Sequence, residues 1–115
     1  MPYMLLIVEP QGQRHTRPPT EGRAVYERML GYTARLKERG VLLASNSLRE
    51  NSARLNVRDG RRSVIDGPFT EAKELIGGFF LIDCATREQA LGFAAECPAA
   101  EWATIEVRET GPCYD

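Results

Sequence analysis

The chain changes direction at Asp66-Gly67-Pro68-Phe69-Thr70-Glu71-Ala72-Lys73-Glu74, a stretch set between two runs of strand-forming residues. Proline is favoured at the second position of a common turn, so this turn is best drawn over residues 67–70. Asp66 then cannot make its usual side-chain bond to the backbone two residues ahead, because Pro68 has no N–H. The sequence therefore predicts a carboxylate at a strand end, beside the ring of Phe69, without its ordinary local partner.

The segments on either side of this turn are predicted to be β-strands. Residues 53–58 alternate apolar with polar or charged side chains, which is typical of a half-buried strand. Asp59-Gly60 predicts a tight hairpin turn because both residues tolerate positive φ, and the returning strand covers residues 61–65. Further apolar or alternating runs predict strands at residues 3–8, 41–48, 77–84 and 103–107.

Two amphipathic segments are predicted to be helices. The first runs over residues 21–39, with Thr20 as its cap and Gly40 as the residue that ends it. The second opens at a capping box, in which Thr86 and Gln89 satisfy each other's backbone donors. One face of the first helix carries an apolar stripe formed by Val25, Met29, Tyr32 and Leu36.

The order of these elements predicts one α+β domain over residues 1–115, with a ferredoxin-like split βαβ plan. In that plan two helices cover one face of an antiparallel sheet, and the strands at 53–58 and 61–65 form an inserted β-hairpin. The two helices leave the other face of the sheet open, and that face is apolar. A second copy of the chain is its natural cover, so we expect a homodimer.

Composition argues against several classes of function. A net charge of −1 supplies no field for nucleic acid or anionic membrane, and the arginines of the hairpin are interpreted as a solvated edge. No apolar run reaches the roughly 20 residues of a membrane-spanning helix. Scattered thiols and one histidine make no metal site, and no glycine-rich phosphate loop opens a helix, so no cofactor is expected. Three cysteines without a secretion signal predict free thiols and a cytoplasmic location.

Three residues are candidates for acid–base chemistry. Asp66 is the candidate base and Lys73 its charge partner, a unit suited to proton abstraction or to binding an acidic ligand. His15 is the only histidine of the chain and lies in a loop rich in glycine, proline and arginine. Each also has a plain structural interpretation: Asp66 as a turn residue, Lys73 as a surface charge and His15 as a solvated loop side chain.

Aromatic side chains are candidates for lining an apolar pocket, as most small-molecule sites require. Those chosen as ligand-binding candidates are Phe69, Tyr26 and Tyr32. The alternative is that aromatic residues at helix and strand spacing belong to the core.

The stretch at 66–74 also carries a family resemblance, together with motifs found in the same order along nearly the whole chain. These motifs are Tyr3-Met4-Leu5-Leu6, Gly77-Gly78-Phe79-Phe80, Cys97-Pro98-Ala99 and Ile105-Glu106-Val107-Arg108. In this combination the chain closely resembles the DGPF proteins, a branch of the YCII-related family. The resemblance implies a ferredoxin-like dimer of the dimeric α+β barrel type. Related proteins of that type hold small organic ligands in a cleft between the sheet and the helices.

The resemblance leaves two functions open. Some YCII relatives are enzymes of aromatic breakdown that use a histidine in the first helix, but residues 21–39 contain none and have Met29 near that turn. One hypothesis is therefore an isomerase, lyase or dehalogenase that uses Asp66 on an acidic or aromatic substrate. The other is a non-catalytic dimeric module that binds a metabolite or a regulatory protein, since many DGPF proteins are encoded near sigma-factor-like regulators.

Overall fold

The computed structural model describes residues 2–114 and shows a ferredoxin-like α+β fold, as the sequence predicts. Short 3-10 helices lie at Gln13–Thr16 and Pro98–Glu101. The main elements are, in chain order, β1 (Tyr3–Pro10), α1 (Pro19–Glu38), β2 (Leu42–Ser47), β3 (Ala53–Arg58), β4 (Arg61–Asp66), β5 (Glu74–Ile82), α2 (Arg87–Glu96) and β6 (Thr104–Glu109).

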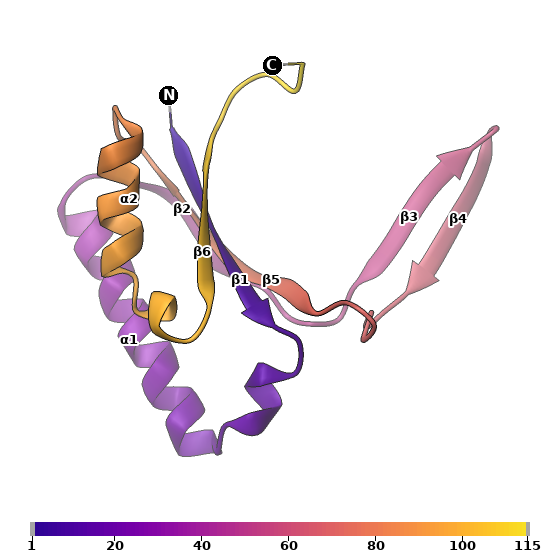
Figure 1. Cartoon of the computed structure of the whole chain (residues 1–115), viewed down its shortest axis with the longest axis horizontal. Helices are drawn as coiled ribbons and strands as arrows, with labels where there is room; N and C mark the ends of the chain where they lie inside the picture. The colour runs from indigo at the N-terminus through magenta and orange to yellow at the C-terminus, as the bar shows by residue number, and fades with distance from the viewer. Residues whose placement is uncertain (1, 115) are drawn as a thin grey trace.

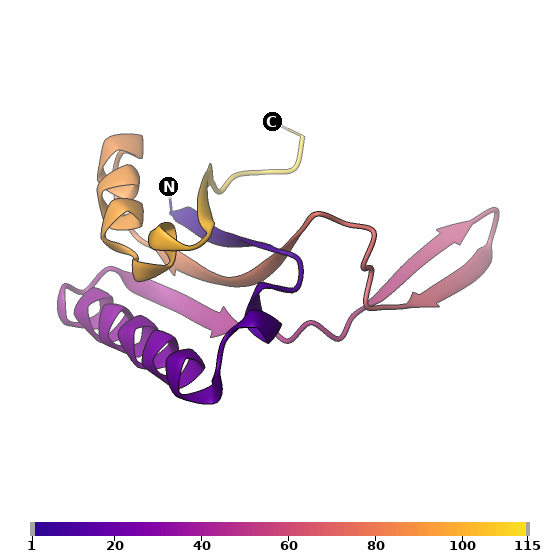
Figure 2. The ribbon, with the colours of Figure 1, turned by 60° about the horizontal axis from the view of Figure 1, so that its bottom comes forward.

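Four strands form one antiparallel sheet in the order β2-β5-β1-β6. Both helices lie on the same side of this sheet, and within residues 2–114 no helix or strand covers its other face (Figures 1 and 2). The side chains of β1 alternate between the two faces, with Tyr3 and Leu5 buried beneath the helices. Met4 and Leu6 consequently lie on the open face, and the chain itself covers the sheet on one side only.

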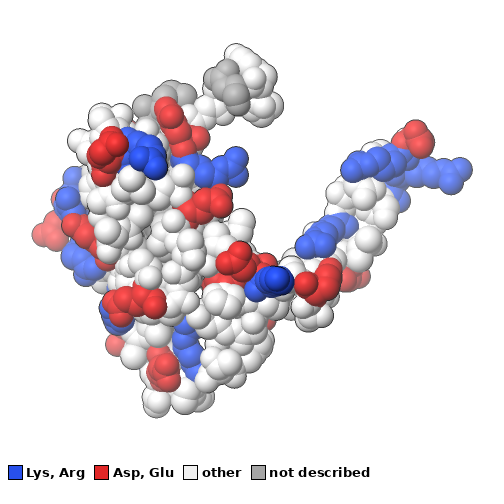
Figure 3. Space-filling view, viewed as in Figure 1, with Lys and Arg blue, Asp and Glu red and all other residues white. Residues whose placement is uncertain are grey.

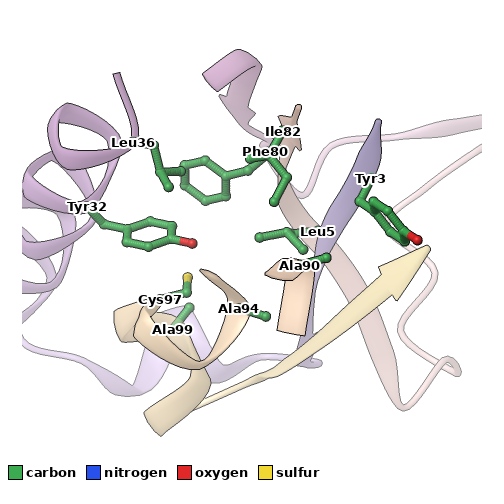
Figure 4. Packing of buried hydrophobic residues seen from close by; sticks show 10 residues of the cluster. All are labelled: Tyr3, Leu5, Tyr32, Leu36, Phe80, Ile82, Ala90, Ala94, Cys97 and Ala99. Carbon is green, nitrogen blue, oxygen red and sulfur yellow. The ribbon is translucent and has the colours of Figure 1, made fainter. Parts of the chain in front are cut away.

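The core fills the space between the helices and the covered face. Tyr32 and Leu36 of α1 pack there with Leu5, Phe80 and Ile82 of the sheet (Figure 4). The ring of Tyr32 meets that of Phe80 edge-on, with centroids 5.1 Å apart. Its hydroxyl donates a hydrogen bond of 2.6 Å to the carbonyl of Phe93, which satisfies the only polar atom of the side chain. Burial raises the pKa of this phenol above its ordinary value.

The β3–β4 hairpin projects from the body of the molecule and is called the arm below (Figures 1 and 2). Its two strands form a separate two-stranded sheet, and every residue in them is exposed. The radius of gyration is 16.1 Å, whereas a compact domain of this length measures about 13 Å. The alternation of residues 53–58 predicts a half-buried strand, but the structure leaves both faces of the arm in solvent.

Local signals account for most of the element boundaries. Asp59 and Gly60 have φ values of 52° and 74°, so the predicted hairpin turn is confirmed. The prediction that Thr20 caps α1 is wrong, because the helix already begins at Pro19. Proline suits a first helical position because its fixed φ matches the helix and its missing N–H would have no partner there.

The capping box at the start of α2 is confirmed. The Gln89 N–H donates to Oγ1 of Thr86 at 3.2 Å, and the Thr86 N–H donates to Oε1 of Gln89 at 3.2 Å. Together they satisfy two donors that the first turn of a helix otherwise leaves free. The cap fixes where α2 begins, and so where Ala90 and Ala94 reach the core.

Replacing Thr86 by alanine removes the acceptor for the Gln89 N–H and should lower the free energy of unfolding by about 1 kcal/mol. Thr86→Ser keeps the hydroxyl and should stay close to the wild type. Urea unfolding followed by circular dichroism measures both. Equal losses in the two variants would show that the hydroxyl contributes nothing.

Candidate functional site

A cleft of about 420 Å³ opens between α1 and the covered face of the sheet, and is called the α1 cleft. A smaller hollow of about 240 Å³ adjoins it and shares several of its walls. The residues common to both are Ile7, Tyr26, Met29, Ser47 and Gly77. The long helix and the sheet thus enclose space of the size that small-molecule sites usually have.

An ion pair with a buried carboxylate forms the floor of the α1 cleft. Glu9, near the end of β1, has a side chain only 7% exposed. Arg14 grips it with two bonds: Nη2 donates to Oε1 at 2.7 Å, and Nε donates to Oε2 at 3.1 Å. A carboxylate can be buried in this way because both of its oxygens meet a charge-assisted donor.

Arg14 also joins segments that are far apart in the sequence. Its Nη1 donates to the carbonyl of Leu48 at 2.7 Å, and its Nη2 donates to the carbonyl of Gly77 at 3.0 Å. The guanidinium therefore ties the loop after β1 to β5 and to the segment that follows β2. Since Arg14 occupies both oxygens of Glu9, this carboxylate holds the floor of the cleft in place and is not a free base.

Gly77 provides the space that the ion pair occupies. A Cβ built on this residue would lie 1.6 Å from Oε1 of Glu9 and 2.8 Å from Nη2 of Arg14. The strand register shifts at the same point, since Ile7 pairs with Gly78 and Val8 pairs with Ile76. Gly77 is therefore the extra residue of a β-bulge, and only glycine leaves room there for the carboxylate.

The mouth of the α1 cleft is built around Trp102. The guanidinium carbons of Arg17 and Arg28 lie 5.6 Å and 5.5 Å from the centroid of its indole ring. Gln13 connects the group, because its Nε2 donates to the Trp102 carbonyl at 2.6 Å and its Oε1 accepts from Nη2 of Arg17 at 3.2 Å. The 3-10 helix that follows β1 thus positions both the ring and one cation.

The two arginines that lie beside the Trp102 ring differ in how their charge is balanced. Arg28 forms a two-pronged bond with Glu101, and that bond lowers the pKa of the glutamate. Arg17 has no carboxylate partner among residues 2–114, and its side chain bonds only to the neutral amide of Gln13. The α1 cleft therefore carries an unbalanced positive charge at its entrance.

The three aromatic residues predicted to bind a ligand lie in three different places. Tyr26 lines the α1 cleft, whereas Tyr32 belongs to the core. Phe69 lines a separate hollow of about 490 Å³ at the base of the arm, called the Phe69 cavity. The guanidinium of Arg54 stacks on the Phe69 ring at 3.7 Å from its centroid. Glu50 also lines this cavity, and its Oε1 is buried without a hydrogen-bond partner in the described part of the chain.

The three residues predicted for acid–base chemistry do not lie together in one site. Asp66 is exposed at the end of β4, and its carboxylate forms no ion pair with Lys73 within residues 2–114. Lys73 is exposed too, and its backbone carbonyl accepts from the Gln11 N–H. His15 is 76% exposed, and its Nε2 lies 2.9 Å from Oε2 of Glu50. None of the three lines the α1 cleft.

Sequence reasoning missed the groups that shape the α1 cleft. Glu9 comes directly after the strand predicted at residues 3–8, and Arg14 and Arg17 fall in the loop that holds His15, so nothing in their positions pointed to a cleft. One signal was present: Gly77 and Gly78 open the strand predicted at residues 77–84, and glycine in a strand often marks a bulge or the close approach of another group. The sequence could not show that Glu9 is that group.

The described residues form neither a metal-binding cluster nor a membrane-spanning helix. Across residues 2–114 no three histidine, cysteine or acidic side chains gather closely enough to hold a metal ion. Nor does any helix of this range combine the length and apolarity needed to cross a membrane.

Fold and cleft together define a ferredoxin-like α+β protein with a ligand-sized hollow between its first helix and its sheet. The chain belongs to the YCII-related family, whose domain model matches residues 1–112. It is also similar to an uncharacterised protein of Rhizobium meliloti (strain 1021), with 46% identity over 59 residues. That match covers 50% of this chain and 48% of the relative, so it spans about half of each protein.

Gly77→Ala should disrupt the floor of the α1 cleft, because the new methyl group occupies the position of the Glu9 carboxylate. A buried carboxylate that loses its charged partner is destabilising, so the free energy of unfolding should fall by about 3 kcal/mol. Gly92→Ala is the matched control: it lies in α2, where an added Cβ meets nothing within 4 Å. Alanine there should be neutral or slightly stabilising. Similar losses in both variants would contradict the role given to Gly77.

Proposed function

We propose that this protein binds a small organic anion with an apolar or aromatic body in the α1 cleft. The observation that carries the proposal is Arg17, a cation at the mouth of the cleft whose described hydrogen-bond partner is neutral. A guanidinium recognises a carboxylate through two parallel N–H donors, which fixes the orientation of the bound group. An acidic ligand would supply the negative charge that the other arginines near the cleft receive from the protein.

The walls of the cleft set the rest of the ligand's chemistry. Ile7, Val25 and Met29 line it, and the thioether of Met29 adapts readily to an apolar body of irregular shape. Trp102 adds a flat aromatic surface at the entrance. A compact acid with an aromatic or branched aliphatic body suits these surfaces, in keeping with the acidic or aromatic ligand expected from the sequence.

Binding without catalysis is the function that this cleft supports best. Its buried carboxylate, Glu9, has each oxygen bonded to Arg14, which commits this side chain to the ion pair at the floor of the cleft. A general base must lie within hydrogen-bond reach of the proton that it removes. The three predicted acid–base candidates do not line this cleft.

The open face of the sheet supports a homodimer as part of this proposal. It presents the apolar side chains of Met4, Leu6, Phe79 and Leu81 on the side away from the helices. Apolar surface of this kind is stabilised when a second surface removes it from water. A cytoplasmic location is proposed as well, and the free thiols of Cys84, Cys97 and Cys113 support it.

A second candidate function is acid–base catalysis beside the Phe69 cavity. It is favoured by the buried Oε1 of Glu50, which lines that cavity and has no hydrogen-bond partner among the described residues. Asp66 does not line the cavity itself, but it stands two residues before Pro68, which does. A substrate with a hydrogen-bond donor would engage Glu50, and Asp66 would take its proton. Lys73 and His15 belong to this proposal as charge partner and second acid–base group.

Arg17→Gln should weaken the binding of aromatic carboxylates by about 30-fold, because a charged hydrogen bond contributes about 2 kcal/mol. Calorimetric titration with benzoate and phenylacetate measures the loss, and benzamide serves as the neutral analogue. Arg23→Gln removes the same charge from an exposed position of α1 outside the cleft, and should bind like the wild type. Equal affinity of the wild type and Arg17→Gln for every acid would refute the proposal.

Asp66→Asn tests the catalytic alternative. If Asp66 is a general base, turnover in a screen of small acidic and aromatic compounds should fall by at least about 100-fold in the variant. Carboxylate binding in the α1 cleft should be unaffected, because Asp66 does not line it. Turnover that survives the substitution would exclude Asp66 as the base.

A further inference from the structure

The Phe69 cavity is a second hollow of ligand size, separate from the α1 cleft. Its volume of about 490 Å³ falls within the range of small-molecule sites, and no residue lines both hollows. Most of its walls come from the segment before β3, the turn before β5 and the start of β5. The cavity therefore lies where the arm joins the body, and a ligand of the α1 cleft makes no use of its charged side chains.

The charges that line the Phe69 cavity are balanced. They belong to two arginines and two glutamates: Arg49, Arg54, Glu50 and Glu74. Figure 3 shows both acidic and basic side chains where the arm joins the body. A ligand with charge of one sign would complement only half of these groups, whereas a zwitterion offers each sign its complement.

Glu50 is the acidic group that the protein leaves incompletely bonded. Its side chain is 21% exposed, and its Oε2 lies 2.9 Å from Nε2 of His15. Its Oε1 is buried and has no hydrogen-bond partner in the part of the chain that the structure describes. A buried acceptor without a donor is destabilising. Because the terminal torsion of glutamate is broad, a small rotation turns this oxygen toward the cavity, where an ammonium group would supply the missing donor.

Arg54 is the basic group that faces the same need. Its guanidinium stacks on the ring of Phe69, 3.7 Å from the centroid. Within residues 2–114 its ion-pair partner is Glu71, at 3.8 Å, which is longer than a hydrogen bond. Stacking holds the plane of the guanidinium and leaves the N–H donors in that plane free. A carboxylate in the cavity would accept two of them in parallel.

The platform beneath Arg54 is itself fixed. Nε2 of Gln11 donates to the carbonyl of Phe69 at 3.0 Å, and the Gly67 N–H donates to the carbonyl of Ser52 at 2.7 Å. A Cβ on Gly67 would lie 2.6 Å from Oγ of Ser52 and 3.0 Å from Cε2 of Phe69. The turn thus packs closely against the segment before β3, and Arg54 is held ready for a ligand before one binds.

Apolar side chains complete the walls of the cavity. Leu48, Pro68, Leu75 and Ile76 line it, and of these Leu48 and Ile76 are 40% and 47% exposed. An apolar group that covers them removes this surface from water, which favours binding. The cavity therefore presents an acceptor, a pair of parallel donors and an apolar wall together.

We infer that the Phe69 cavity binds an α-amino acid with an apolar side chain. Its ammonium group bonds to Glu50, its carboxylate to Arg54, and its side chain packs on Leu48 and Ile76. This site is independent of the acid-binding site in the α1 cleft, and it requires no catalysis by Asp66. The protein then has two ligand sites that differ in the charge they recognise.

Calorimetric titration with L-leucine, isocaproate and isoamylamine tests the inference, because the last two lack the ammonium and the carboxylate, respectively. Leucine should bind at least about 10-fold more tightly than either analogue, since each charged hydrogen bond contributes. The comparison is made in Arg17→Gln as well as in the wild type. Isocaproate that binds only to the wild type belongs to the α1 cleft, whereas leucine should bind equally to both proteins.

Substitutions assign the two charged contacts. Glu50→Gln should weaken leucine binding by about 30-fold and abolish the preference for leucine over isocaproate. Arg54→Gln should weaken it similarly and abolish the preference over isoamylamine. Arg58→Gln is the matched control, because Arg58 lies on the same face of β3 as Arg54 but outside the cavity. Circular dichroism should show all three variants folded.

Three outcomes would overturn this site: no binding of leucine, equal affinity for leucine and both analogues in Arg17→Gln, or leucine affinity in Glu50→Gln and Arg54→Gln equal to that in Arg58→Gln. Loss of leucine binding in Arg17→Gln would also overturn it, since the amino acid would then occupy the α1 cleft. The function proposed for the α1 cleft fails separately, through unchanged binding of benzoate in Arg17→Gln.

Discussion

A buried carboxylate destabilises a fold unless hydrogen-bond donors, preferably charged ones, bind its oxygens. In this chain the buried carboxylate is that of Glu9. Arg14 donates two hydrogen bonds to the Glu9 carboxylate and also donates to the carbonyls of Leu48 and Gly77. One guanidinium thereby holds the loop after β1 against β5 and against the segment that leads to the arm. An apolar pair of similar volume would fill the same space, but it would not join these segments in one geometry. The floor of the α1 cleft is therefore as well defined as its sheet.

The ion pair between Glu9 and Arg14 also determines how the rest of the cleft is arranged. Because Arg14 fixes the 3-10 helix at Gln13–Thr16, Gln13 can bond to the Trp102 carbonyl and to Arg17 at the same time. The entrance is thus positioned by the same short segment as the floor. The bulge at Gly77 is the condition for this arrangement, since a side chain there would occupy the position of the carboxylate. A local irregularity in one strand makes the ligand-sized hollow possible.

Sequence reasoning succeeded where a few neighbouring residues determine the structure. The cap formed by Thr86 and Gln89 and the turn at Asp59-Gly60 are such cases, and the order of elements then fixed the fold class. It failed for the α1 cleft, because the bonds from Arg14 span 34 residues to Leu48 and 63 to Gly77. The argument for Asp66 was local in the same way: the missing bond to Pro68 says nothing about whether a cavity lies beside the carboxylate. A site built from residues far apart in the sequence can be recognised only once the structure shows which of them meet. A turn can be predicted from its own few residues.

Charge balance separates the α1 cleft from the ion pairs elsewhere on the folded body. Among the described residues outside the arm, three arginines have an acidic partner: Arg14 has Glu9, Arg28 has Glu101 and Arg39 has Glu96. Arg17 lines the cleft instead, and its side chain bonds to the neutral amide of Gln13. Its positive charge lies beside the apolar side chains that form the walls of the cleft. A cation beside apolar surface is the combination that an acidic ligand with an apolar body requires, since the charge orients the acid and the walls remove its body from water.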